Sequence, residues 1–291
     1  MSAEKINPPV RPEYLRTLKT FEEARHQRDL PLATRIFRRD AFRKFLILVA
    51  LAALWEILAR IQNNDLLLPS FSAVFRALIE GIGSGELLSK SLVSLTLLIK
   101  GYLTGILCAF LLTSLAVSMR AWQDLLSTLT SMFNPLPPIA LLPVSLLWFG
   151  LGQGSLVFVL VHSVLWPLAL NTHAGFQSVP ETLRMTGRNY GLSGIRYIAQ
   201  ILIPAALPSI LAGLKIGWAF AWRTLIAAEL VFGASSGNGG LGWFIFQNRN
   251  ELYTDKVFAG LTMVILIGLL VENLIFLPLE RITVKRWGIQ R

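Results

Sequence analysis

The chain has 291 residues, of which 54% are hydrophobic and only 15% are charged. A soluble domain of this length needs more polar surface, and several apolar blocks approach or exceed the roughly 20 residues that cross a bilayer. The net charge of +10 could suggest nucleic acid, but 11 of the 27 Lys and Arg residues lie in the first 44 positions. No groove pattern of basic and aromatic residues accompanies them. We therefore predict an all-α polytopic membrane protein.

Residues 1–41 form a basic, proline-containing segment that precedes the first apolar block. This order is the reverse of that in a secretory signal peptide. We expect an N-terminal extension in the cytoplasm, where an amphipathic patch could lie on the membrane surface or against a partner. An extension without fixed structure is the alternative.

Six apolar blocks follow and predict about six transmembrane helices. They cover residues 42–61, 91–119, 125–149, 155–171, 198–232 and 257–279. The first block and residues 66–86, which are too polar to span and should form a short helix and loop at the outer face, make one unit over 42–86. The core covers 87–280, and a basic tail over 281–291 follows. Basic residues number 19 on the side of the termini and five on the other, which favours both termini in the cytoplasm.

The fifth block carries small residues at every fourth position, which lets helix backbones approach closely. Pro204 and Pro208 near its start predict a bend. The small residues pack either at a subunit interface or within one chain, and the pattern leaves both open. They are Ala205, Ser209, Gly213, Gly217 and Ala221.

The one long inner loop between the blocks, residues 172–197, has the signals of two short helices joined at a glycine. Ser178 and Glu181 have the spacing of a capping box, and Gly191 can end the first helix in a left-handed conformation. Ser193 can cap the second helix. Such a knuckle could dock on a partner, although a well-capped surface linker has the same pattern. The candidate docking residues are Glu181, Arg184, Met185, Gly187, Arg188, Tyr190 and Gly191.

The letters GRNYGLSGIRYIAQILIP, from Gly187 to Pro204, resemble the loop signature of ABC importer permeases. Met185-Thr186-Gly187 stand where that signature has Glu-Ala-Ala, and its Gly and Pro positions match Gly191 and Pro204. Upstream, NPLPPIALLPVSLLWFGLG, from Asn134 to Gly152, is similar to permeases of the nitrate, sulfonate and taurine group. The resemblance runs from about residue 67 to residue 280.

This resemblance implies a type I ABC importer permease of a bacterial inner membrane. It implies a second copy of the chain, two ATP-binding cassette subunits and a periplasmic substrate-binding protein as partners. ATP and Mg²⁺ would belong to the ATP-binding subunits, and loop 172–197 would be the element that couples the permease to them. The chain itself would need no cofactor.

Ionisable residues inside the apolar blocks are expensive in a bilayer and are candidate functional residues. Arg223 lies within the fifth block and could meet an anionic substrate, or could pair with Glu229 or Glu272. If Arg223 meets an anionic substrate, these three residues would line the path of a small solute such as a sulfonate, nitrate or carboxylate.

Several enzyme signals are missing. The sequence has no G-x-x-x-x-G-K-[ST] motif for ATP phosphates, no metal-ligand cluster and no nucleophile with a matching base. Residues 237–242 match G-x-G-x-x-G by letter, but they follow a membrane block, and we interpret them as a re-entrant or surface loop. We therefore predict a transport subunit that is not an enzyme, with a transporter driven by an ion gradient as the alternative.

Overall fold

The computed structural model describes residues 40–232 and 239–285, which contain helices and no strand. The all-α prediction is confirmed. In chain order the elements are α2 (Asp40–Gln62), α3 (Phe71–Gly83), α4 (Glu86–Ser118), α5 (Arg120–Phe133), η1 (Pro138–Leu141), α6 (Leu142–Phe149), α7 (Gln153–Gln177), α8 (Glu181–Asn189), α9 (Gly194–Tyr197), η2 (Ile198–Leu202), α10 (Ile203–Phe232), α11 (Leu241–Asn250), α12 (Thr254–Val271), η3 (Glu272–Phe276), α13 (Leu277–Glu280) and η4 (Arg281–Lys285).

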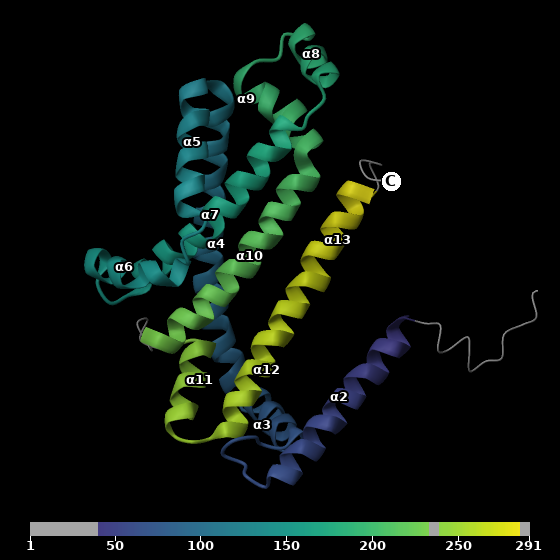
Figure 1. Ribbon diagram of the computed structural model, residues 1–291, viewed down its shortest axis with the longest axis vertical. Helices are drawn as coiled ribbons and strands as arrows, with labels where there is room; N and C mark the ends of the chain where they lie inside the picture. The colour runs from purple at the N-terminus through teal and green to yellow at the C-terminus, as the bar shows by residue number, and fades with distance from the viewer. Residues whose placement is uncertain (1–39, 233–238, 286–291) are drawn as a thin grey trace, which may run out of the picture. The chain divides into compact units, whose positions relative to one another are not determined.

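By internal contacts the chain divides into two units, residues 1–51 and residues 52–291. The described part of the first unit is the beginning of α2. The second unit holds the remaining helices, and in it α8 and α9 lie at one end of α7 and α10 while α3 lies toward the other end (Figure 1).

Five continuous helical segments among the described residues are long and apolar enough to cross a membrane, and a sixth is possible if one bent pair forms a single span. The five cover Phe42–Gln62, Glu86–Ser118, Gln153–Gln177, Gly194–Val231 and Thr254–Thr283. This agrees with the prediction of about six transmembrane helices. The prediction of a short helix between the first two spans is confirmed by α3, whose first turn is capped by Ser70 Oγ, which accepts from the Ala73 amide at 3.3 Å.

The predicted helix over residues 125–149 is wrong as a single rod. Helix α5 ends at Phe133, and the following segment turns by 92° before it continues as η1 and α6. Pro135, Pro137 and Pro138 lack amide donors and restrict the residues before them, so an α-helix cannot continue through this stretch. We call residues 134–138 the proline bend.

Helices α4, α7 and α10 form the centre of the core, and glycines let them approach closely. A Cβ at Gly101 would clash with the Leu160 Cβ, and one at Gly105 would come within 2.7 Å of the Val164 Cβ. On the other side of α7, Gly217 lies against the same Val164, with 3.3 Å to its Cγ1. Val164 is therefore held between α4 and α10 and is fully buried.

The small residues of α10 pack against α7 of the same chain. A Cβ at Gly213 would lie 2.9 Å from the Asn171 Cβ, and the Ser209 Cβ lies 2.7 Å from the position a Cβ would take at Gly175. Ala221, at the outer end of the series, is fully buried. At Ser209, Gly213 and Gly217 the stripe therefore packs on α7 of the same chain.

The start of the fifth span is irregular, as its prolines suggested. Residues Ile198–Leu202 form a π-helical turn directly before Ile203 and Pro204, and Pro208 lies inside α10. Single π-turns inside helices relieve local mismatches in the hydrogen-bond ladder. The loop 172–197 therefore enters α10 through a locally widened turn.

Candidate functional site in the docking loop and the membrane core

The docking loop begins with the end of α7, where the predicted capping box is wrong. Ser178 has helical φ and ψ of −75° and −8°, and its Oγ donates to the Gly175 carbonyl at 2.8 Å. It therefore closes α7 and cannot cap α8, because an N-cap residue needs an extended backbone. Helix α8 starts after Pro180, and Glu181 Oε2 lies 3.9 Å from Arg184 Nε within the same helix.

Arg184 joins α8 to α7. Its Nη2 donates to the Phe176 carbonyl at 2.6 Å and its Nε donates to the Val179 carbonyl at 3.1 Å. These oxygens belong to the C-terminal end of α7, where a positive charge is favourable. Only 25% of the side chain is exposed. The structure thus directs Arg184 toward its own chain, whereas Arg188, one turn further along α8, is exposed.

Gly191 ends α8 in the left-handed conformation that the sequence predicted. Its φ is +72°, the Leu192 amide donates to the Gly187 carbonyl at 3.0 Å, and the Gly191 amide donates to the Arg188 carbonyl at 2.9 Å. These two bonds make a Schellman motif. Ser193 takes the N-cap position of α9 with an extended backbone, although its side chain makes no capping bond.

Gly187 fixes α8 against the start of the fifth span. It is buried, and a Cβ there would lie 2.9 Å from Ile201 Cγ1 and 3.0 Å from Tyr197 Cε2. Leu183 and Tyr190, one turn away on either side, are 44% and 82% exposed. The glycine is a packing contact inside the chain, and its two neighbours face outward.

The docking loop exposes large hydrophobic side chains among polar and charged ones. They are Leu183, Met185, Tyr190 and Ile195, and Ile195 is 80% exposed. Large exposed apolar groups can mark surfaces that bind another protein or a membrane. The loop is thus attached to its own chain through Arg184 and Gly187 and leaves these four side chains uncovered.

Glu229, which the sequence placed in the solute path, is buried and bound by its own chain. Its side-chain oxygens accept from Ser94 Oγ of α4 at 2.9 Å, and Oε2 accepts from the Gly242 amide at 2.8 Å. The Ser94 oxygen in turn accepts from the Leu241 amide at 2.9 Å. The carboxylate thus joins α4, α10 and the N-terminal end of α11, where a negative charge is favourable.

Gly240 and Gly242 make room for this carboxylate. A Cβ at either position would lie less than 3 Å from Glu229 atoms. In the segment 237–242, whose letters match G-x-G-x-x-G, Gly240 and Gly242 therefore allow close packing at the start of α11. Residues 237 and 238 lie outside the described ranges. Sequence reasoning missed Ser94 and Gly242 as partners of Glu229, because no periodicity links positions in three different helices.

Arg223 does not pair with either predicted carboxylate. Glu272 Oε1 instead lies 2.6 Å from Lys215 Nζ, and Glu229 is bound as described above. Arg223 Nε donates to the Ala219 carbonyl at 2.9 Å, and its guanidinium carbon lies 5.1 Å from the centre of the Phe220 ring. The Arg223 side chain is exposed, and no carboxylate of the described residues forms an ion pair with it.

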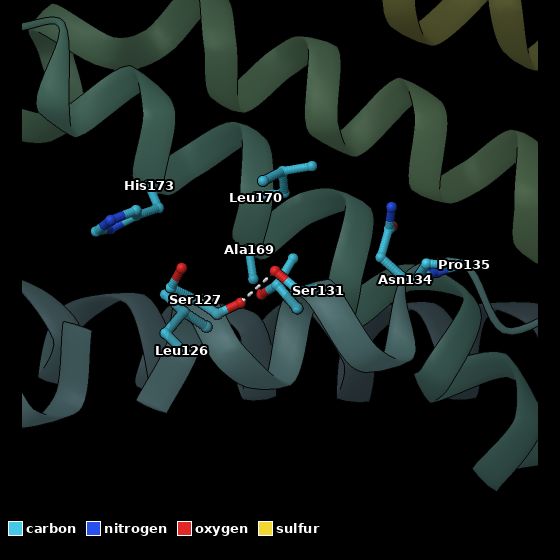
Figure 2. Close-up of a pocket in the computed structure, with 9 residues that line it drawn as sticks. Leu126, Ser127, Ser131, Asn134, Pro135, Ala169, Leu170 and His173 are labelled. Atoms are coloured by element: carbon cyan, nitrogen blue, oxygen red, sulfur yellow. Dashed lines mark hydrogen bonds between the residues drawn. The ribbon is translucent and has the colours of Figure 1, made fainter. Parts of the chain in front are cut away.

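Two cavities flank the proline bend. A cavity of about 220 Å³ lies between α5 and α7, where Asn134 stands at one end and His173 at the other (Figure 2). A larger cavity of about 340 Å³ is lined by the bend, by His162 and Trp166 of α7, and by Phe220 of α10. Asn134 and Pro135 line both. Among the described residues no group of three His, Cys, Asp or Glu side chains could hold a metal ion.

Comparison with known proteins decides the family. Residues 101–282 match the model of the binding-protein-dependent transport system inner membrane component. The chain belongs to this family. It is 33% identical over 246 residues to a putative ABC transporter permease of Methanocaldococcus jannaschii, covering 83% of this chain and 91% of that one.

Two further relatives have names that state a substrate. A putative aliphatic sulfonates transport permease of Escherichia coli is 31% identical, covering 77% of this chain and 84% of its own length. A nitrate import permease of Synechocystis sp. is 28% identical, covering 82% and 88%. The chain is thus an ABC importer permease of the nitrate, sulfonate and taurine group, a membrane subunit and not a catalytic one.

Proposed function

We propose that this permease forms the translocation path of an ATP-driven importer for a small anion, which a periplasmic binding protein delivers. Two copies assemble with two ATP-binding cassette subunits, which bind ATP and Mg²⁺ and hydrolyse the nucleotide. Both termini lie in the cytoplasm of a bacterial cell, and the permease itself holds no cofactor.

The docking loop carries this proposal. It presents Leu183, Met185, Tyr190 and Ile195 to solvent while Arg184 and Gly187 attach it to α7 and to the start of the fifth span. A partner that moves this loop therefore moves two helices of the core. The unpaired charge of Arg223 and the relatives named for sulfonates and nitrate support an anionic substrate.

The experiment replaces Ile195 by aspartate in the complete transporter in proteoliposomes. A buried interface cannot hold a lone carboxylate without a large penalty, so Ile195→Asp should release the ATP-binding subunit during purification and abolish ATP-dependent uptake. The matched control is Leu67→Asp, a change at an exposed leucine in the loop before α3. The proposal is wrong if Ile195→Asp retains the ATP-binding subunit and full uptake, or if uptake proceeds without that subunit.

A further inference from the structure

The larger cavity at the proline bend, which we call the His162 cavity, has the size and position of a ligand site. Its volume of about 340 Å³ is at the lower end of the range for small-molecule pockets. His162 lies ten positions into the 25-residue helix α7, and Phe220 lies on the neighbouring α10. The cavity is therefore within the membrane-spanning part of the core.

Two side chains that line this cavity have buried nitrogens without a hydrogen-bond partner, whereas the Ser163 hydroxyl donates to the Val159 carbonyl. Trp166 is only 7% exposed, and its indole nitrogen is buried without a hydrogen bond. Both ring nitrogens of His162 are also buried without a hydrogen bond. A buried donor without an acceptor costs about 1–3 kcal/mol. Asn134 adds an amide donor to the lining, and none of the described residues that line the cavity is Asp or Glu.

Arg223 contacts a residue that lines the cavity. Its guanidinium carbon lies 5.1 Å from the centre of the Phe220 ring, and Phe220 is one of the lining side chains. Its other contact is the carbonyl of Ala219 on its own helix, and the side chain is exposed. A positive charge attracts an anion over several ångströms, and the attraction grows as the local dielectric constant falls.

The backbone of the bend gives an independent reason for water or solute at this place. Asn134 to Pro138 contains three prolines and is not α-helical. Irregular backbone at membrane depth is tolerated where protein covers it or where it lines a water-filled space, because lipid cannot satisfy its polar groups. The bend forms one wall of the His162 cavity.

We propose that the His162 cavity is a binding site for a small oxyanion, with a sulfonate or nitrate as the chemical class. Trp166 and Asn134 donate hydrogen bonds to its oxygens, His162 donates through its protonated ring nitrogen, and Arg223 supplies the positive charge at the edge. This assignment rests on the proposed function for its anionic solute, but the site itself can be tested without transport.

The test measures how charge affects the labelling of a cysteine in the cavity. Phe220→Cys, in a Cys108→Ala background of the complete reconstituted transporter, is treated with methanethiosulfonate reagents that carry either an ethylsulfonate or an ethyltrimethylammonium group. The ratio of the two rates is normalised to the same ratio at Leu67→Cys, an exposed position far along the chain. We expect about a tenfold preference for the sulfonate reagent, as a charge a few ångströms away at intermediate dielectric predicts.

Variants separate the roles of the residues. Arg223→Gln should reduce the preference to that of Leu67→Cys, while Arg223→Lys should retain most of it. His162→Phe should weaken the protection of the cysteine by sodium nitrate or taurine at least several-fold, with sodium gluconate, a bulkier polyhydroxy carboxylate, as the control anion. Asn134→Cys is a second reporter for the case that Phe220→Cys does not assemble.

Equal normalised rates for both reagents at both reporters would overturn the proposal, and so would a preference that Arg223→Gln leaves unchanged. Absence of labelling at both reporters in an assembled transporter would overturn it as well. Labelling needs no ATP, so the result is independent of the test of the proposed function. If uptake does not require the ATP-binding subunit while the charge preference persists, the proposed function fails and the anion site stands.

Discussion

At the scale of single residues, the role of a charged side chain in a membrane helix depends on the groups that it contacts. The sequence alone could not identify these groups. Arg223, Glu229 and Glu272 were equivalent candidates for the solute path. In the structure Glu272 pairs with Lys215, Glu229 is bound by Ser94 and Gly242, and only Arg223 has no counter-charge among the described residues. Three-dimensional proximity between helices distant in sequence decides these roles.

Local signals in the docking loop show the same limit. The left-handed Gly191 was predictable, because that conformation favours glycine and the preceding residues favour a helix. The capping box was not predictable, because the Ser178 hydroxyl can either accept from an amide of α8 or donate to a carbonyl of α7. In the structure it donates to the Gly175 carbonyl of α7. The inward direction of Arg184 depends on carbonyls of α7 that no local pattern of α8 reveals.

We predict that Glu229 is a structural anchor of α11. Glu229→Ala removes the carboxylate that accepts from two donors, the Ser94 hydroxyl and the Gly242 amide, and leaves that amide without its acceptor. Because hydrogen bonds to charged groups contribute about 1.5–3 kcal/mol each, the variant should unfold several degrees below the parent in detergent. Thermal unfolding of the purified permease measures this, with Glu80→Gln at an exposed carboxylate of α3 as the control that should change little. A melting temperature of Glu229→Ala equal to that of Glu80→Gln would contradict the anchor.

At the scale of elements, the sequence predicted where helices occur but not where one of them breaks. Apolar length and composition do not distinguish a straight span over 125–149 from the bent pair of α5 and α6. The prolines at 135, 137 and 138 were a sufficient signal, since three prolines in four positions are incompatible with a continuous ladder of hydrogen bonds. The spacing of small residues likewise predicted close packing but not the identity of the partner helix.

Glycines of the core and of the surface should respond to alanine in opposite directions. Gly213→Ala would place a Cβ 2.9 Å from the Asn171 Cβ and 3.2 Å from the Leu168 backbone, so we expect overpacking that costs about 1–3 kcal/mol. Gly83→Ala, at the end of α3, meets nothing within 4 Å and should be neutral or stabilise by up to about 1 kcal/mol. Thermal unfolding of the two variants checks this, and the prediction fails if Gly213→Ala is as stable as Gly83→Ala.

At the scale of the whole molecule, the docking loop has two attachments to the membrane core. Arg184 bonds to the end of α7, and Gly187 packs on Tyr197 and Ile201 at the start of the fifth span. Helices α7 and α10 are packed together through glycines along much of their length. A displacement of the loop by an ATP-binding subunit would therefore reach both helices at once, including the walls of the His162 cavity.

The last prediction concerns this transmission. Gly191→Val has free space around its new side chain, so its effect comes from the backbone, because a β-branched residue at a φ of +72° is strained by more than the roughly 1–2 kcal/mol of an ordinary residue. The strain should break the Schellman motif and loosen α8 from α9 while the apolar contact surface remains. We expect the complete transporter to assemble and hydrolyse ATP, but to take up little solute per ATP. Gly191→Asn is the matched control, because asparagine tolerates the left-handed conformation and should retain most of the coupling. ATP hydrolysis and solute uptake are measured in parallel in proteoliposomes. Normal uptake per ATP in Gly191→Val would show that the geometry of this turn does not couple hydrolysis to transport.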